Sequence, residues 1–341
     1  MSISEVLHKY GSSATKTIDE NLISTVAVVN IPLRVVEQPN VSWAFDMKKC
    51  IDGTPLLTQL CGEDVVAACS HSGLVVCVRV RDGRCLWKTQ ITTRFEASVA
   101  RSGEYFVLGG YDGNVYFLSM LNAYDRKLYK LDSRSRKCVW SCLIQSGSPA
   151  CPLLLERTVI VTTIKGSVEA IDINEGVHVW TFEANAPVFS AVSPYGTSGF
   201  VGSVDGTVMK IGLDNGEKEL AVNIHEPVFS EVRFLNDLIY IVTERGSLFV
   251  ADSMLNILRH FRFESHRFVV PPMRMDVRTV CIVSSYGSLI IYDEGGNCAR
   301  AFRLGGGHVF SSVVYLKEKG LALVGCRDNF LRCFIFPSIS D

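Results

Sequence analysis

A short motif returns along the chain at an almost constant spacing, and this repetition constrains the fold more than any other feature. Its copies are HSGLVVCVRV at residue 71, YDGNVYFLSM at 111, YDRKLYKLDS at 124, IKGSVEAIDI at 164, VDGTVMKIGL at 204, ERGSLFVADS at 244, SYGSLIIYDE at 285 and CRDNFLRCFI at 326. The steps between copies are 40 or 41 residues, with one exception of 13. Further period-two segments, such as APVFSAVS and LIYIVT, follow the copies and are separated by Gly, Asn, Asp or Pro turns. Each unit therefore predicts four short strands.

Four strands in a unit of about 40 residues are typical of a β-propeller blade, whereas helical repeats of that length would show a period of 3.6 residues. We therefore expect an all-β propeller of seven, or eight, four-stranded blades. Trp43 begins a segment at the fourth-strand position, and the last copy ends near Phe336 after its third strand. Pairing of residues 43–47 with strands in 309–335 would close the ring with an N-terminal strand and leave no open edge.

The step of 13 residues, between Tyr111 and Tyr124, predicts a truncated repeat junction near residues 120–125. About 28 more residues there would restore an even spacing and an eighth blade. The sequence leaves open a distorted blade or a seven-membered ring with an extra strand. Residues 1–33 carry no repeat landmark, so we expect a flexible linker there and a propeller over residues 34–341.

Two residue types recur at fixed places in the unit. Glycine occupies the tight turn into the third strand, where a positive φ costs it little. Tryptophan opens the fourth strand, and a large ring at one repeated place is interpreted as a wedge between neighbouring blades. The turn glycines are Gly73, Gly113, Gly166, Gly206, Gly246 and Gly287, and the wedges are Trp43, Trp87, Trp140 and Trp180.

Charge and targeting signals limit the environment of the chain. The formal net charge is −1, with 34 basic and 35 acidic residues interspersed, so neither nucleic acid nor an anionic membrane surface is indicated as a partner. The sequence has no apolar run of membrane-spanning length, and its first residues lack the pattern of a signal peptide. The 12 cysteines include no C-x-x-C pair and are interpreted as reduced thiols. We therefore expect a cytoplasmic protein.

Longer stretches carry a family resemblance. IKGSVEAIDINEGVHVW and YDRKLYKLDSRSRKCVW resemble the pyrroloquinoline-quinone (PQQ) repeat, which implies a PQQ-like (quinoprotein-type) propeller. VEQPNVSWAFDMKKCIDGTPLL and VGCRDNFLRCF are similar to the C-terminal propeller of the β-alanine-activating enzyme family, acyl-CoA-synthetase relatives also called aminoadipate-semialdehyde dehydrogenases. The resemblance covers about residues 34–336 and implies that an adenylate-forming domain and a phosphopantetheine carrier precede the propeller and activate an amino acid with ATP. The sequence contains neither an ATP loop ending in Pro-Lys nor the G-G-x-S motif of a carrier.

No residue pattern in the sequence predicts chemistry, so we expect no catalytic residue, no cofactor and no metal. A quinone enzyme would need an acidic pair for calcium, basic or aromatic clamps and often a vicinal cysteine pair. GSSATKT at 11–17 lacks the second glycine and the preceding strand of a phosphate loop. Asp112, Asp205 and Asp328 lie beside repeat turns and are expected to accept main-chain N–H groups. The seven histidines lack metal-ligand spacing and are interpreted as surface or blade-gap residues: His8, His71, His178, His225, His260, His266 and His308.

These observations favour a non-catalytic propeller that docks a protein partner, in particular the adenylation and carrier domains of an amino-acid-activating synthetase. The chain alone is not expected to be an enzyme. One alternative is an oxidoreductase that depends on a quinone or a metal. The other is a WD40-like adaptor, which is disfavoured because Lys, Ser or Thr follows tryptophan where that repeat has Asp.

Overall fold

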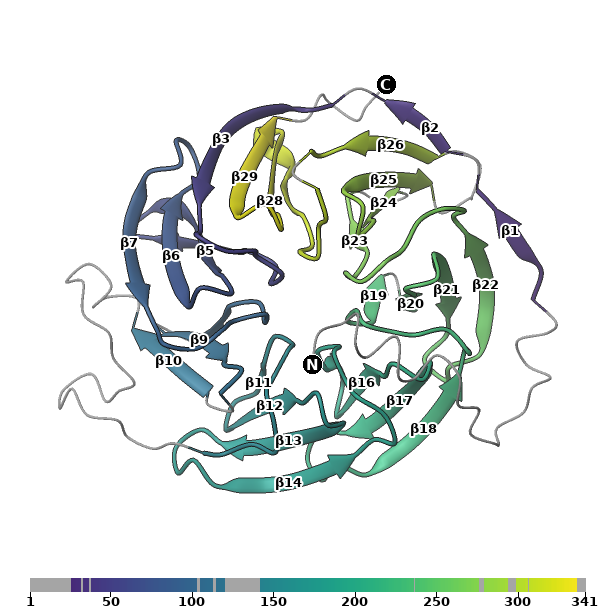
Figure 1. Cartoon of the computed structure of the whole chain (residues 1–341). Coiled ribbons are helices and arrows are strands. Elements are labelled where there is room, and N and C mark those ends of the chain that lie inside the picture. The colour runs from purple at the N-terminus through teal and green to yellow at the C-terminus, as the bar shows by residue number, and fades with distance from the viewer. Residues whose placement is uncertain are drawn as a thin grey trace.

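The computed structural model describes residues 26–31, 33–36, 38–102, 105–112, 115–119, 142–235, 237–275, 279–293, 299–305 and 307–335. Within these ranges the chain forms seven sheets arranged around a ring, and the helical part is one 3-10 turn, η2 (Lys317–Lys319) (Figure 1). The predicted all-β propeller class is confirmed. Over the same ranges, no helix is both long and apolar enough to cross a bilayer.

Strands that follow one another along the chain are neighbours in each sheet, and they pair antiparallel. The strands are β4 (Leu56–Leu60), β5 (Glu63–Cys69), β6 (Leu74–Arg79) and β7 (Cys85–Gln90); β8 (Ala100–Ser102), β9 (Tyr105–Gly109) and β10 (Val115–Ser119); β11 (Leu153–Leu154), β12 (Thr158–Thr162), β13 (Ser167–Asp172) and β14 (His178–Glu183); β15 (Ser193–Tyr195), β16 (Ser198–Gly202), β17 (Thr207–Gly212) and β18 (Lys218–Asn223); β19 (Arg233–Leu235), β20 (Leu238–Val242), β21 (Ser247–Ala251) and β22 (Ile257–Arg262); β23 (Met273–Arg274), β24 (Thr279–Val283), β25 (Ser288–Asp293) and β26 (Ala299–Arg303); and β27 (Val314–Leu316), β28 (Leu321–Gly325) and β29 (Phe330–Ile335).

The middle strands carry apolar residues at consecutive positions because each sheet packs between two others. Val65 and Ala67 of β5 belong to a core cluster shared with β9, whereas Val66 and Ala68 belong to a cluster shared with β28 and β29. All four side chains are buried. Alternate residues therefore fill opposite inter-sheet gaps, and full burial of a valine stabilises the fold by about 1.5–3 kcal/mol.

The N-terminal segment runs along the outer edges of three consecutive sheets (Figure 1). Strand β1 (Val28–Asn30) pairs parallel with β22, β2 (Leu33–Val36) pairs parallel with β26, and β3 (Asn40–Asp46) pairs antiparallel with β29. Strand β3, which contains Trp43, is therefore the fourth strand of the sheet formed by the C-terminal strands.

The structure differs from the expected linker over residues 1–33, because β1 and the start of β2 pair with the propeller. Val28 and Val29 are 53% and 44% exposed. Strand β1 is therefore held by main-chain hydrogen bonds to the edge of β22, and burial of these two side chains contributes little. Ile31, by contrast, is buried in the cluster between the two sheets that β1 and β2 join.

Three predicted features lie outside the described residues: the repeat junction at 120–125, Gly113 and Trp140. The sheet beside them has three described strands.

The turn glycines predicted before the third strands adopt the left-handed conformation wherever they are described. Gly73, Gly166, Gly206, Gly246 and Gly287 have φ between 80° and 101°. At Gly73 a Cβ atom would also lie 1.9 Å from the Ile91 carbonyl oxygen. Both the conformation and the close approach of the backbone therefore require glycine there.

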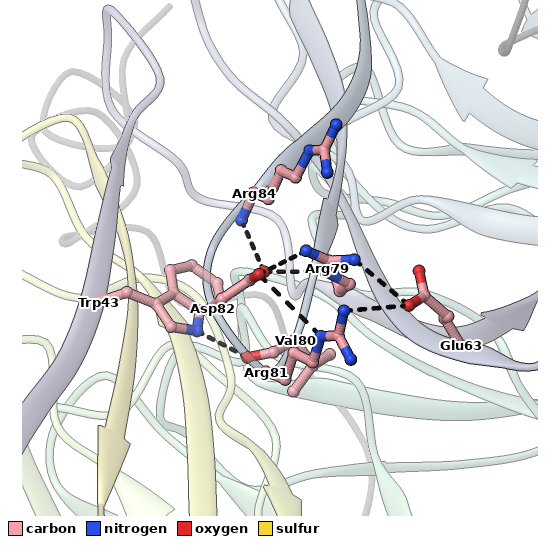
Figure 2. A network of polar contacts seen from close by, with 7 residues as sticks. All are labelled: Trp43, Glu63, Arg79, Val80, Arg81, Asp82 and Arg84. Atoms are coloured by element: carbon pink, nitrogen blue, oxygen red, sulfur yellow. Dashed lines mark hydrogen bonds and ion pairs between the residues drawn. The ribbon is translucent and has the colours of Figure 1, made fainter.

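The indoles of Trp43 and Trp180 each reach into the next sheet. Trp43 Nε1 donates to the Val80 carbonyl at 2.6 Å (Figure 2). A Cβ atom on Gly83 would lie 2.9 Å from the ring. Trp180 repeats the arrangement, since its Nε1 donates to the Leu213 carbonyl at 3.0 Å and a Cβ atom on Gly216 would lie 2.5 Å from the ring. Each indole thus rests on a turn glycine of the next sheet.

Trp87 lies deeper than these two indoles. It is 5% exposed, and its ring centroid is 5.8 Å from that of Phe106 in the following sheet. The three described tryptophans therefore all contact a neighbouring sheet.

An ion-pair network supports the turn beneath Trp43. Arg79 Nε donates to Asp82 at 2.9 Å and its Nη1 lies 3.3 Å from Glu63, while Asp82 also accepts the main-chain N–H of Arg84 at 3.1 Å (Figure 2). The hydrogen bonds from Arg79 lower the pKa of Asp82 to about 2. The carboxylate therefore stays ionised and holds the turn in place.

Candidate functional site

One face of the ring carries two kinds of segment that touch in every sheet. In an antiparallel sheet, the turn between the second and third strands lies at the same end as the connection that leaves the fourth strand. We call this side the connection face. The turn between the third and fourth strands, which contains Gly83 or Gly216, lies on the opposite face.

The same main-chain hydrogen bond joins a turn to the preceding connection in all seven sheets. The donors are the N–H groups of His71, Tyr111, Ile164, Val204, Glu244, Ser285 and Arg327, and the acceptors are the carbonyls of Cys50, Arg94, Gly147, Pro187, Pro227, Arg267 and His308. Because the backbone makes this contact, the side chain at the turn position is free to differ from sheet to sheet.

A second repeated contact runs from the connection back to the turn. Ile51, Phe95, Val188 and Val228 donate their N–H groups to carbonyls of Cys326, Ser70, Thr163 and Ser203, respectively. The residues that follow these donors are Asp52, Glu96, Phe189 and Phe229. The connection face therefore has acidic side chains in one sector and phenylalanines in another.

The apolar sector is closed by its own side chains. Phe189 and Phe229 are buried with their ring centroids 5.4 Å apart, and they cluster with Val204 and Ala186. This sector resembles the interior of the protein.

The charged sector contains an ion-pair network, which we call the Asp52 network: Asp52, His71, Arg94, Glu96 and Arg327. Asp52 accepts two hydrogen bonds from Arg327, at 2.9 Å from Nε and 2.7 Å from Nη2. His71 Nε2 lies 3.1 Å from Asp52 Oδ2 and 3.7 Å from Glu96 Oε1. Arg94 Nη2 lies 2.9 Å from Glu96 Oε1. The bidentate pair of Arg327 and Asp52, and the chain of charges that continues from it, thus join the C-terminal sheet to the next two sheets, β4–β7 and β8–β10.

The two arginines of the network are stacked on aromatic rings. The Arg327 guanidinium carbon lies 3.8 Å from the centroid of Phe310, and that of Arg94 lies 3.7 Å from the centroid of Tyr111. The arginine side chains are 34% and 37% exposed, whereas that of Asp52 is 9% exposed. The cations therefore form the accessible surface of the network, and cation–π contacts help to orient them.

Burial and ion pairing act in opposite directions on these groups. Burial raises the pKa of Asp52, but His71 and Arg327 outweigh it and leave that pKa below its usual range. Burial lowers the pKa of His71, but Asp52 and Cys50 outweigh it and raise the pKa to about 9. Burial raises the pKa of Glu96 more than Arg94 and His71 lower it. At neutral pH the described groups therefore hold an ionised Asp52 against a protonated His71 and Arg327.

Two residues of the network, together with Cys50, supply the elements of a metal site. Cys50, Asp52 and His71 each place one ligand atom so that all three atoms lie within 4.8 Å of one another. A thiolate, a carboxylate oxygen and an imidazole nitrogen are ligand types that zinc binds.

None of these residues is predicted as a site from the sequence. His71 is expected there to be a surface or blade-gap residue, and in the structure it lies inside the network with its side chain 13% exposed. The prediction for two turn carboxylates is confirmed, since Asp205 accepts the N–H of Thr207 at 3.0 Å and Asp328 accepts that of Phe330 at 3.4 Å. His8 lies outside the described residues.

A signal for the charged sector was nevertheless present in the sequence. At the turn position whose N–H donates to the preceding connection, His71, Glu244 and Arg327 are charged, whereas Ile164 and Val204 are apolar. Variation between charged and apolar residues at one repeated position indicates a local role for the charged ones, which a search for motifs by spacing does not detect.

Comparison with known proteins places the chain among PQQ-repeat propellers. The family described as "Outer membrane protein assembly factor BamB" matches residues 34–150 and 71–238, which together span more than half of the chain. The chain is 22% identical to the beta-alanine-activating enzyme of Drosophila melanogaster over 93% of its own length and 37% of that protein. It is 26% identical to the outer membrane protein assembly factor BamB of Burkholderia pseudomallei over 51% of its length and 44% of that protein. The chain thus spans less than half the length of either relative.

Two solved structures show the same fold. The crystal structure of BamB from Moraxella catarrhalis superposes with a TM-score of 0.62 at 13% identity, covering 87% of this chain and all of that one. The computationally designed Ika8 protein also superposes with a TM-score of 0.62 at 13% identity, covering 88% of this chain and all of that one.

Proposed function

Because the chain belongs to the family of PQQ-like repeats described as outer membrane protein assembly factor BamB, we propose that it is a non-catalytic propeller that docks other protein domains. The observation that carries this proposal is the Asp52 network on the connection face. Main-chain hydrogen bonds hold the turns there in all seven sheets, so the charged side chains are not required for the repeat itself. Charged, partly exposed side chains on a rigid scaffold are typical of a recognition surface.

The partner we propose is a pair of adenylation and carrier domains of an amino-acid-activating synthetase, in the same polypeptide or in a separate cytoplasmic chain. The alignment with the beta-alanine-activating enzyme supports this choice because it covers 93% of the chain, whereas that with BamB of Burkholderia pseudomallei covers 51%. A ring of seven blades closed by β3 is part of the proposal. The seven sheets and the pairing of β3 with β29 support it.

Binding by the full chain tests the proposal. The chain is immobilised, and an adenylation–carrier protein of the beta-alanine-activating type is titrated over it. We expect Arg94→Glu, on the connection face, to weaken binding more than about 10-fold. Arg81→Glu is the matched control because Arg81 is 69% exposed and lies in the turn between β6 and β7, on the opposite face. Equal binding by the two variants, or no binding by the unmodified chain, would contradict the proposed docking.

The non-catalytic character has its own test. The purified chain is incubated with ATP, β-alanine and labelled pyrophosphate, and we expect no exchange of label into ATP. Exchange by the isolated chain would overturn the assignment, and a stoichiometric bound quinone would favour the oxidoreductase alternative.

A further inference from the structure

The three potential metal ligands lie at the junction between the C-terminal sheet and the sheet β4–β7. Cys50 and Asp52 belong to the connection from β3 to β4, and His71 belongs to the turn between β5 and β6. The Cys50 carbonyl accepts the main-chain N–H of His71 at 3.0 Å, so the backbone fixes the connection against this turn. The ligand atoms are therefore brought together by the fold and not by a flexible side chain alone.

The imidazole nitrogen of His71 is buried against a carboxylate without a well-directed hydrogen bond. Nε2 lies 3.1 Å from Asp52 Oδ2, close enough for an ion pair when the imidazole is protonated, but no hydrogen bond of good geometry joins the two atoms. A nitrogen and an anionic oxygen that approach each other in this way are also placed to share a metal ion.

The distances agree with a tetrahedral zinc site. Zinc bonds of about 2.0–2.1 Å to nitrogen and about 2.0–2.2 Å to oxygen, at a tetrahedral angle, put the two ligand atoms about 3.4 Å apart. The observed separation of Nε2 and Oδ2 is 3.1 Å. The Cys50 thiol is not exposed, and its sulfur lies within 4.8 Å of both atoms.

We propose that Cys50 Sγ, Asp52 and His71 Nε2 bind a divalent transition-metal ion of the zinc class, with a fourth position open to water. The ion would take the place of the protons on Cys50 and His71, because metal ligands bind in their deprotonated forms. Asp52 can bind the ion and Arg327 at the same time, because a carboxylate offers about four lone-pair sites and Arg327 occupies two of them. Arg327 then orients the ligand from outside the coordination shell.

Such an ion would fasten the connection after β3 to the sheet β4–β7. This connection joins the N-terminal strand of the C-terminal sheet to the next sheet, so metal binding would strengthen the junction where the ring closes. The inference concerns a metal site and does not depend on the proposed docking.

Cobalt titration of the full chain tests the site. The protein is freed of metal with a chelator, and Co²⁺ is added while the near-ultraviolet and visible spectrum is recorded. We expect one ion per chain, a thiolate-to-cobalt charge-transfer band and visible bands of tetrahedral cobalt, all displaced by Zn²⁺. The melting temperature should rise when Zn²⁺ is added.

Matched variants assign the ligands. Cys50→Ser should abolish the charge-transfer band, and His71→Gln should lower the affinity more than about 10-fold. The controls are Cys61→Ser and His225→Asn, both at exposed residues with positive φ, and these should leave the spectrum unchanged. A wild-type spectrum without the thiolate band, or a band that persists in Cys50→Ser, would overturn the proposal even if another variant failed to fold.

Discussion

Replacing Gly216 by alanine tests whether indole packing on a turn glycine stabilises the contact between sheets. Gly216 has φ of 72°, and a Cβ atom there would lie 2.5 Å from Cε3 of Trp180. Alanine would therefore meet two separate penalties, one from the left-handed backbone and one from the indole. A matched control is available at Gly62, where φ is 80° and a Cβ atom would meet nothing within 4 Å.

The two penalties can be estimated separately. A left-handed backbone costs a non-glycine residue about 1–2 kcal/mol, so Gly62→Ala should lower the free energy of unfolding by that amount. Overpacking against the indole adds about 1–3 kcal/mol at Gly216. We therefore expect Gly216→Ala to cost about 2–5 kcal/mol in total, clearly more than the control.

Urea unfolding at equilibrium, followed by tryptophan fluorescence and circular dichroism, measures these differences, and a double-mutant cycle isolates the contact. In the Trp180→Ala background the indole is absent, so Gly216→Ala should cost only about 1–2 kcal/mol, the same as Gly62→Ala. Equal costs for Gly216→Ala with and without Trp180 would refute the view that the indole packs on this glycine.

Three further outcomes follow from other contacts. Deleting residues 1–36 removes β1, β2 and the buried Ile31 and should lower the free energy of unfolding by about 2–4 kcal/mol. Deleting through Asp46 should also expose the edge of β29 and cause aggregation. Equal solubility of the two truncations by light scattering would rule out a closing role for β3. Burial raises the pKa of Glu231 more than Arg233 lowers it, so the folded state favours the protonated form. The wild type should therefore lose stability relative to Glu231→Gln as pH rises from about 4 to 7. A constant difference in melting temperature between the two proteins across that range would argue against this. Arg327→Met leaves Asp52 paired with His71 alone and should lower the free energy of unfolding by about 1–3 kcal/mol, after allowance for the partial exposure of the guanidinium. The control Arg81→Met, at an exposed residue, should cost less than about 0.5 kcal/mol in the same urea titration. Equal costs would show that the pair of Arg327 and Asp52 contributes no net stability.

Much of the fold could be predicted from the sequence because local rules decide it. The continuous apolar run that includes Val65 and Val66 indicates a strand buried on both faces, and Gly73 indicates a turn with positive φ. No comparable sequence pattern predicts the pairing of β1 with β22. It uses main-chain groups at a sheet edge, and the side chains of Val28 and Val29 remain exposed.

The candidate site could not be predicted from spacing, for a different physical reason. Asp52 and Arg327 are 275 residues apart, and they meet because β3 pairs with β29, so that the connection after β3 lies beside the turn before β29. Cys50 and Asp52 also lack any regular spacing to His71, since a connection and a turn supply them separately. Motif searches detect ligands that share one element, whereas this cluster depends on contacts between segments that are distant in the sequence.

The uneven connection face also bears on how a partner would be oriented. A ring of similar sheets offers a docking partner several nearly equivalent orientations, and main-chain hydrogen bonds of the same kind at every turn do not distinguish them. Side chains do distinguish them, because Phe189 and Phe229 close one sector while Arg94, Arg327 and Arg267 remain accessible in others. Charged pairs fix the register of an interface more than they increase its affinity. A partner with acidic groups would therefore be held in an orientation that places those groups over the arginines and away from the phenylalanines.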